Sequence, residues 1–414
     1  MNPCVKKSVA KILPLPLIII LLGFPQISET IYTPSLPLIT RDLMTTPYWT
    51  EMSLTIYFIG FALGVAFWGG CCDRIGRRPS LLVGLSVYTV TCFLLGMCSS
   101  INQLLFWRFL QAFGASVGSV VTQTMLRDIY EGKERHQIFA VVSGALAFTP
   151  ALGPWIGGYT AMLFGWQASF YLLTIAGLLL FAYSLRYLPE TCHIKNRSGI
   201  SWHVIAKMLK DQHLWRHIFL ISLCNGIVFG FYAEAPFLFI DLMEFTPSTY
   251  GSFGLVLCCA GLGASFISHK LNEIMSPEMI IGWAALLIMS GSVNLLNAAW
   301  VGLFHPTISL AGMAYVILGI GLTFTGIGLL ISNSLSLALK DYKDHLGLAG
   351  AFFGFAYYMG VACCMATVSY LHNGTPYPMP LLFLFFSLLL CKLGNSFRKW
   401  GSGAIPLIQK RKRL

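Results

Sequence analysis

The sequence predicts an all-helical membrane protein with twelve transmembrane helices in two six-helix bundles. Apolar residues make up 56% of the 414 residues and charged residues only 10%, against roughly 25% charged residues in an average soluble domain. So few charged side chains cannot coat a water-soluble globule, and the 14% of aromatic residues excludes a disordered chain. One span needs about 20 apolar residues, so the length suits twelve spans joined by short loops.

Apolar stretches divide the chain at regular intervals. They lie at 12–35, 50–70, 80–98, 104–127, 138–162, 166–188, 217–240, 250–268, 279–303, 309–333, 346–370 and 379–397. The one long polar interruption falls at the middle of the chain. We therefore expect an N-terminal bundle at 1–188, a cytoplasmic linker at 189–216, a C-terminal bundle at 217–397 and a basic cytoplasmic tail at 398–414.

The basic residues predict the orientation in the membrane. Of the 27 Lys and Arg residues, 25 fall in segments that share one side of the membrane if the helix number is even. Only Arg41 falls in a loop on the other side, and Arg108 falls within a span. This asymmetry follows the positive-inside rule and predicts a bacterial inner-membrane protein with both termini in the cytoplasm. The net charge of +11 then reflects orientation and contact with anionic lipid, not nucleic-acid binding.

The cysteines and histidines give no sign of a metal centre or a catalytic site. The twelve cysteines lie mostly within spans and lack C-x-x-C spacing, so we expect free thiols. The nine histidines lie mostly in loops, where we expect surface or interfacial roles. The chain also lacks H-E-x-x-H and G-x-S-x-G motifs, so we expect no enzyme activity, no metal and no cofactor.

Three formal charges fall well inside predicted spans, namely Glu29, Arg108 and Glu234. Each costs at least ~2.5 kcal/mol to place at the centre of a membrane helix, so each must face a polar space or a partner. Intramembrane ionisable residues are functional candidates for this reason. The structural alternatives are helix–helix pairing for the two carboxylates, and pairing with Glu29 or capping of carbonyls for Arg108.

Glu29 belongs to a polar stripe on the first span. Gln26, Glu29, Thr30 and Thr33 recur at three- and four-residue spacing and so share one helical face. The flanking residues Pro25 and Pro34 are expected to loosen the helix.

Glu234 lies in the seventh span, two residues before Pro236. The first span of each half therefore carries one carboxylate near a proline, and in a repeated architecture the two would face one pathway. Burial favours the protonated form of a carboxylate, so these two residues are candidates to carry a proton.

The loop after the second span contains a spaced motif of glycine, aspartate and arginine. Its members are Gly69, Asp73, Arg74, Gly76, Arg77 and Arg78. The motif resembles the G-x-x-x-D-R-x-G-R-R loop signature of the major facilitator superfamily. The resemblance implies a conformational role, with Gly69 at a close helix contact, Gly76 in a tight turn and Asp128 joining an Asp73–Arg77 cluster that latches one state.

Two further segments resemble the same superfamily. The segment from Arg108 to Gly114, which includes Gln111, resembles its fourth-helix R-x-x-Q-G-x-G motif, in which the arginine is linked to proton coupling, although Ala112 here replaces a usual glycine. Gly153, Pro154, Gly157 and Gly158 resemble its antiporter signature, which is typical of exporters.

The end of the first span points to one subfamily. The segment from Tyr32 to Pro37 resembles the Y-x-P-A-L-P motif of Bcr/CflA-type drug exporters. That subfamily usually has an aspartate at the position held here by Thr30, whereas Glu29 lies one residue earlier, about 100° around the helix. Glu234 is not a usual feature of the subfamily either.

The sequence therefore predicts a monomeric secondary transporter that exports small amphipathic, drug-like solutes in exchange for protons by alternating access. It would be driven by the proton gradient, with the lipid bilayer, the solute and protons as its partners. The residues expected at a central binding site are Glu29, Glu234, Arg108, Gln26, Tyr32, Gln111, Asn225 and Tyr232. The alternatives are a dedicated exporter of a metabolite, such as a siderophore or an amino acid derivative, and a proton symporter that imports a nutrient.

Overall fold

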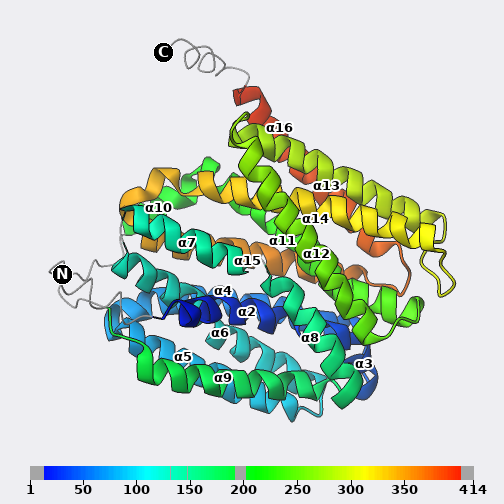
Figure 1. Cartoon of the computed structure of the whole chain (residues 1–414), viewed down its shortest axis with the longest axis horizontal. Coiled ribbons are helices and arrows are strands. Elements are labelled where there is room, and N and C mark those ends of the chain that lie inside the picture. Colours follow the sequence, from blue (N-terminus) through cyan, green and yellow to red (C-terminus); the bar gives the residue numbers. More distant parts are fainter. Residues whose placement is uncertain (1–13, 131, 147, 192–201, 402–414) are drawn as a thin grey trace.

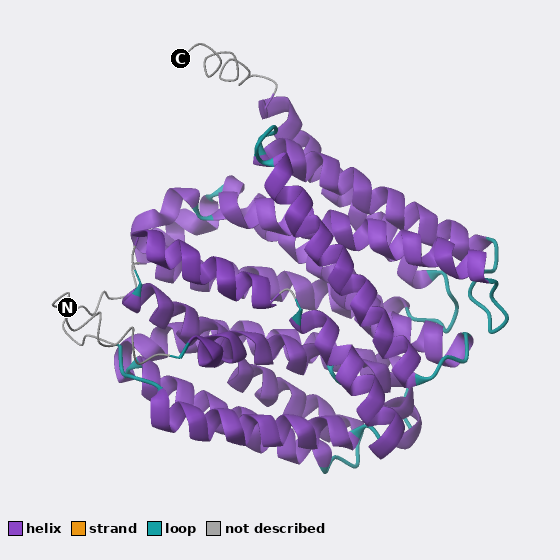
Figure 2. Ribbon diagram, viewed as in Figure 1, coloured by secondary structure: helices purple, strands orange, loops and turns teal. Residues whose placement is uncertain are grey.

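The computed structural model describes residues 14–130, 132–146, 148–191 and 202–401. The start of the first predicted span, residues 192–201 of the linker and residues 402–414 of the tail lie outside these ranges. The described part of the chain contains helices and no strand (Figure 2). In chain order the elements are α2 (Leu15–Thr30), η1 (Thr33–Ser35), α3 (Leu36–Asp42), α4 (Pro47–Ile75), α5 (Arg77–Gly96), α6 (Ile101–Ile129), α7 (Gly132–Leu146), α8 (Thr149–Phe164), α9 (Gln167–Tyr187), α10 (Trp202–Lys210), α11 (Gln212–Pro236), η2 (Phe237–Leu242), α12 (Pro247–Leu271), α13 (Pro277–Trp300), α14 (Leu310–Ala338), η3 (Lys340–His345), α15 (Leu346–Leu371) and α16 (Pro378–Gly401).

The helices form two halves that pack side by side (Figure 1). In the first half, α6 packs against α4 and α5, and α9 packs against α5. In the second half, α13 packs against α14 and α16, and α12 packs against α14. The halves meet along α4 with α15 and along α8 with α12, so the predicted pair of helical bundles is confirmed.

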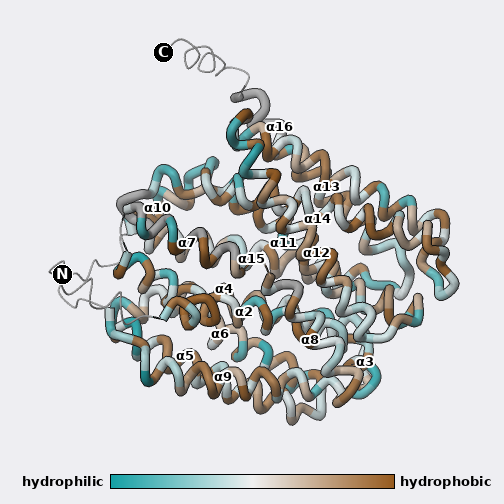
Figure 3. The backbone as a smooth tube through the Cα atoms, viewed as in Figure 1, coloured by the Kyte–Doolittle hydropathy of each residue, from teal (hydrophilic) through white to brown (hydrophobic). Residues whose placement is uncertain are grey.

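The predicted spans correspond to these helices. Ten helices in the described residues are long and apolar enough to cross a membrane. The fifth predicted span corresponds to α7 followed by α8, and the twelfth to α16, whose apolar part covers Pro378–Gly394. Large apolar side chains such as Phe164 and Leu179 are exposed on the outside of the bundle, and apolar segments reach the periphery throughout (Figure 3). Lipid acyl chains would cover such a surface.

Local capping chemistry sets where the helices begin. Proline occupies an initial position of α4, α12 and α13, where its missing N–H costs nothing. The Thr246, Ser276 and Ser309 side chains accept hydrogen bonds from the first turns of α12, α13 and α14. The Asp211 carboxylate does the same for α11, accepting from the backbone N–H groups of His213 and Leu214 at 2.9 and 3.2 Å. The seventh span therefore starts at Gln212, earlier than the predicted residue 217.

The first span changes its helical form part-way along. Its α-helix ends at Thr30, a short 3₁₀ turn follows over Thr33–Ser35, and α3 continues to Asp42. Pro34 lies in the 3₁₀ turn and cannot donate a backbone hydrogen bond. The predicted loosening is therefore present at Pro34, shortly after Glu29, whereas α2 continues unbroken through Pro25.

Glycines bring α8 and α12 into backbone contact across the two halves. A Cβ atom on Gly158 would overlap the carbonyl oxygen of Pro247, and one on Gly251 would overlap the carbonyl oxygen of Pro154. Each helix thus offers a glycine to a proline carbonyl of the other. Only glycine permits so close an approach of two backbones.

Candidate functional site

Arg108 lies at the centre of the first half. It projects from the N-terminal third of α6, and its side chain is completely buried. Its guanidinium carbon lies 4.1 Å from the ring centre of Tyr32 and 4.2 Å from that of Tyr57. Its Nη1 donates to Gln111 Oε1 at 2.6 Å and to the Ser28 carbonyl oxygen at 3.3 Å. Aromatic faces and neutral acceptors therefore hold this charge.

The Glu29 carboxylate is buried without a partner of its own. The residue is only 4% exposed at the end of α2. Among the described residues, no hydrogen bond or ion pair includes its carboxylate, and no ion pair joins it to Arg108. The predicted structural alternative, direct pairing of Glu29 with Arg108, is therefore not what this structure contains.

The rest of the polar stripe forms local hydrogen bonds. Thr30 Oγ1 donates to the Gln26 carbonyl oxygen at 3.1 Å, and Thr33 Oγ1 donates to the Thr30 carbonyl oxygen at 2.8 Å. The Gln26 side chain accepts a hydrogen bond from Thr149 of α8. Glu29 is thus the member of the stripe whose side chain forms no hydrogen bond with the described residues.

Aromatic side chains from both halves surround this region. Phe58 and Phe61 of α4 contact Tyr358 of α15, at 6.2 and 4.6 Å between ring centres, and Phe58 lies 4.4 Å from Phe229 of α11. Tyr232 also belongs to this set, because its ring lies 6.1 Å from that of Phe229. The Glu29 carboxylate is close enough to act electrostatically on the Tyr232 and Tyr358 hydroxyls.

The other predicted site residues take structural positions. The buried Tyr32 hydroxyl pairs with Ser53 Oγ at 2.7 Å, and Gln111 Nε2 donates to Cys92 Sγ at 3.1 Å. Asn225 Nδ2 donates to the Ile221 carbonyl oxygen of its own helix at 2.9 Å. Tyr32, Gln111 and Arg108 are therefore brought together, whereas no described contact joins Asn225 to them.

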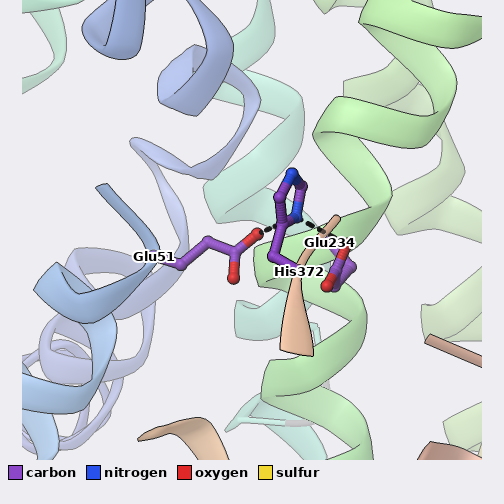
Figure 4. Close-up of side chains that lie close together, drawn as sticks. All are labelled: Glu51, Glu234 and His372. Atoms are coloured by element: carbon purple, nitrogen blue, oxygen red, sulfur yellow. Dashed lines mark hydrogen bonds and ion pairs between the residues drawn. The ribbon is translucent and has the colours of Figure 1, made fainter. Parts of the chain in front are cut away.

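Glu234 lies in a different cluster. His372 Nδ1 lies 3.0 Å from Glu234 Oε2 and 2.8 Å from Glu51 Oε1, as Figure 4 shows. We name Glu51, Glu234 and His372 the outer triad, because they lie at the end of the bundle that the charge asymmetry predicts to face outward. Glu51 comes from the first half and the other two residues from the second. None of the described contacts joins Glu234 to Glu29.

The two carboxylates of the outer triad raise the pKa of its histidine. His372 lies just beyond the span that ends at Leu371. Burial lowers the pKa of His372, but the hydrogen bonds and charges of Glu234 and Glu51 outweigh burial and raise that pKa to about 10. The His372 side chain therefore joins two carboxylates of opposite halves.

Two histidine predictions are wrong. His217 is fully buried, and its Nδ1 lies 2.7 Å from Ser334 Oγ. The His372 side chain is only 9% exposed and contacts two carboxylates. His217 follows the polar linker and His372 begins the loop after α15, but neighbouring helices cover both side chains in the folded chain. Glu51 was likewise missed, because its position near the start of a span is typical of an interfacial residue.

The loop between α4 and α5 forms a compact ionic cluster. Arg77 lies 2.7 Å from Asp73 and 3.1 Å from Asp128. Gly76 has a φ of +104°, a conformation that favours glycine. Glu190, which the sequence did not single out, accepts hydrogen bonds from the backbone N–H groups of Arg77 and Arg78 at 3.0 and 3.1 Å. The predicted joining of Asp128 to Asp73 and Arg77 is present, and Glu190 caps the helix that follows.

The remaining motif residues lie at helix contacts. Arg74 lies in the last turn of α4. A Cβ atom on Gly69 would lie 3.4 Å from the Ala351 Cβ of α15, in the opposite half. On α8, Cβ atoms on Gly153 and Gly157 would overlap Thr30 and the Ile31 carbonyl oxygen. Gly153 and Gly157 therefore pack α8 against the end of α2, directly beside Glu29, while Gly158 faces α12.

A family model described as the Major Facilitator Superfamily matches residues 18–391. The chain belongs to this superfamily. Membership also gives the functional class of the protein, because members of this superfamily are membrane transporters and not enzymes. The chain is accordingly a multi-pass membrane transporter.

Several known proteins are similar to this superfamily member. An uncharacterized transporter of Rickettsia bellii (strain RML369-C) is 36% identical over 400 residues, covering 92% of this chain and 95% of the relative. A bicyclomycin resistance protein homolog of Haemophilus influenzae is 25% identical, with 87% and 89% of the two chains covered. The xylose transporter XylE from E. coli, solved in a partially occluded inward-open conformation, has a TM-score of 0.73 at 12% identity, with 94% and 97% covered. This last likeness concerns the fold alone.

Proposed function

We propose that this superfamily member exports small amphipathic solutes across the bacterial inner membrane in exchange for protons. The observation that carries the proposal is the buried Glu29 carboxylate, which has no hydrogen-bond or ion-pair partner in the described chain and lies within electrostatic range of Arg108 in its own half and of Tyr358 in the other. A carboxylate in such a place favours a proton or a cation. The similarity of the chain to a bicyclomycin resistance protein homolog supports a drug-like solute.

The proposed cycle has Glu29 alternate between a proton and a solute. The solute stacks on the aromatic residues Phe58, Phe61, Phe229 and Tyr358 and displaces the proton from Glu29. Arg108, held 4.1–4.2 Å from two tyrosine rings, stays charged and favours release of the proton. The two halves then rock about the site, with both termini in the cytoplasm and the protein acting as a monomer.

A second candidate is a dedicated exporter of an anionic metabolite. Arg108 favours it, because its Nε and Nη2 atoms are buried and have no hydrogen-bond partner in the described chain. An anionic group reaching Arg108 would satisfy both nitrogens. A nutrient-importing symporter stays a third reading, less favoured by the glycine- and proline-rich α8.

Glu29→Gln tests the proposed proton site. The purified protein in weakly buffered detergent is mixed with ethidium, chloramphenicol or bicyclomycin, and proton release is followed with a pH dye. We expect wild type to release protons on binding at least one compound and Glu29→Gln to release none, because the amide has no proton to exchange. Proteoliposomes with an imposed pH gradient then measure transport, which we expect Glu29→Gln to lose by at least about 100-fold.

The control is Glu273→Gln, which makes the same change at an exposed position between α12 and α13. It should match wild type in both assays. Full gradient-driven transport by Glu29→Gln would reject Glu29 as the proton site. Binding of an anionic metabolite, with none of a cationic dye, would favour the second candidate.

A further inference from the structure

The outer triad brings one nitrogen and two oxygen ligands to a single point. Glu51 projects from the first turns of α4, Glu234 from the last turn of α11, and His372 from the segment after α15 (Figure 4). One ligand atom of each residue lies within 4.8 Å of the other two. The three residues are separated by 183 and 138 positions in the sequence, so the tertiary fold alone assembles them.

The cluster is buried and has unused oxygen atoms. Glu51 is fully buried, and Glu234 is 5% exposed. Glu51 Oε2 and Glu234 Oε1 are buried and have no hydrogen-bond partner among the described residues. Ser369 lies near Glu51, but its hydroxyl donates to the Met365 carbonyl oxygen at 3.1 Å. A buried carboxylate oxygen without a partner is costly, and a bound cation would satisfy it.

The imidazole is held in place and reachable from one side. The Phe237 ring lies edge-on to His372, with 5.0 Å between ring centres. This contact limits rotation of the imidazole away from the two carboxylates. The 9% exposed His372 side chain lies in the loop between α15 and α16, so an ion would enter past it from the outer side.

We propose that the outer triad is a binding site for a divalent transition-metal ion, with Zn²⁺ the best match, that joins the two halves of the transporter. Imidazole nitrogen with carboxylate oxygen is a common Zn²⁺ ligand set, at about 2.0–2.2 Å. Tetrahedral bonds of that length separate ligand atoms by roughly 3.3–3.5 Å, close to the 2.8 and 3.0 Å between His372 Nδ1 and the two oxygens. Three ligands leave a fourth position for water.

The metal–nitrogen bond forms on His372 Nδ1, and the proton from that atom goes to solvent. Two carboxylates then balance the two charges of the ion. Mg²⁺ and Ca²⁺ favour six or more oxygen ligands, which these three side chains do not offer, so selectivity should favour the transition metals.

The ion would stabilise the state with the outer ends together. Its ligands come from both halves, so it binds only where Glu51 meets Glu234 and His372. A ligand shifts an equilibrium toward the state that it binds more tightly. This consequence rests on the proposed alternating-access function, and it makes external Zn²⁺ an inhibitor of transport. The binding site itself does not depend on transport.

Calorimetry with ZnCl₂ tests the site on purified, tag-free protein in detergent. We expect one ion per chain in wild type, no binding of Mg²⁺, and affinity at least about tenfold weaker in His372→Asn and in Glu51→Gln. His305→Asn is the matched control, because His305 also lies in an outer loop and its Nδ1 lies 3.1 Å from the hydroxyl of Thr307, with no carboxylate in contact among the described residues. Absence of Zn²⁺ binding to wild type, or equal affinity in all variants, would overturn the proposal.

A conservative variant separates ligand loss from misfolding. His372→Cys keeps a metal ligand at the same position, so we expect it to bind Zn²⁺ and Cd²⁺, whereas His372→Asn binds neither. Failure of His372→Cys to bind, with unchanged thermal unfolding in EDTA, would count against the site.

The bridging role has its own readout. Spin labels at the exposed outer positions Met44 and Leu310 report the distance between the halves, after the exposed Cys259 and Cys363 are changed to serine. We expect Zn²⁺ to narrow the distance distribution in a His372-dependent manner. Intact metal binding in a protein that moves no solute would reject the proposed function and leave the metal site standing.

Discussion

Arg108 shows how one residue can stay charged in a membrane. Its guanidinium contacts two tyrosine rings, and among the described residues only its Nη1 donates hydrogen bonds. Planar guanidinium groups stack on aromatic faces, whereas a lysine ammonium is a compact and strongly hydrated charge. The identity of this residue therefore matters beyond its charge.

We expect Arg108→Lys to destabilise the protein by about 1–3 kcal/mol, since both ring contacts and the Gln111 hydrogen bond are lost. Thermal unfolding of the purified protein measures the effect. Arg186→Lys serves as the control, because Arg186 is exposed and its tyrosine contact is longer, at 5.8 Å. Equal melting temperatures of the two variants would show that the tyrosine pair contributes nothing.

The sequence identified buried functional candidates where a charged residue interrupts an apolar span. Glu29, Arg108 and Glu234 stood out because charges are rare within apolar spans, and all three are buried. Glu51 and His372 carried no such signal, since each lies near the end of a span. Their importance arises from contacts between distant parts of the chain, which no local pattern encodes.

At the scale of elements, α8 depends on glycine for its position. Gly153 and Gly157 face the end of α2, and Gly158 faces α12. The segment was recognisable from its spacing of Gly and Pro. The sequence did not show which neighbouring helix each glycine faces, because the rotation of a helix about its axis depends on packing against several other helices.

Gly157→Ala should destabilise the fold by about 1–3 kcal/mol, because the added methyl group overlaps the Ile31 carbonyl oxygen and forces α8 away from α2. Fluorescence-detected thermal unfolding is the measurement. Gly321→Ala in α14 provides the comparison, since no atom lies within 4 Å of its added Cβ and alanine favours a helix. A Gly157→Ala protein as stable as Gly321→Ala would refute the close contact.

For the whole molecule, the contact between halves extends along α4 and α15 as well as α8 and α12. The two-bundle architecture followed from hydropathy and charge asymmetry. The relative placement of the two bundles could not be predicted in this way, because it depends on many weak contacts spread over four helices. Alternating access requires these contacts to part and reform.

A disulfide between the halves tests this requirement. A Cβ on Gly69 would lie 3.4 Å from Ala351 Cβ, near the usual Cβ separation of a disulfide. In a background with Cys71 and Cys72 changed to serine, we expect Gly69→Cys with Ala351→Cys to cross-link on oxidation and to lose transport until reduced. Gly70→Cys with Ala351→Cys is the control, since nothing lies within 4 Å of a Cβ on Gly70. Undiminished transport by the cross-linked protein would contradict rocking about this interface.

The meeting of Gly158 with Pro247, and of Gly251 with Pro154, has a mechanical consequence. At these two points backbone meets backbone, and elsewhere along the same two helices the Ser248 hydroxyl donates to Met162 Sδ at 3.2 Å. Glycine has no side chain, so no bulky group separates the two helices at these two points. Two prolines and two glycines thereby hold α8 and α12 at backbone contact, and a side chain larger than glycine at either position would force the two halves apart.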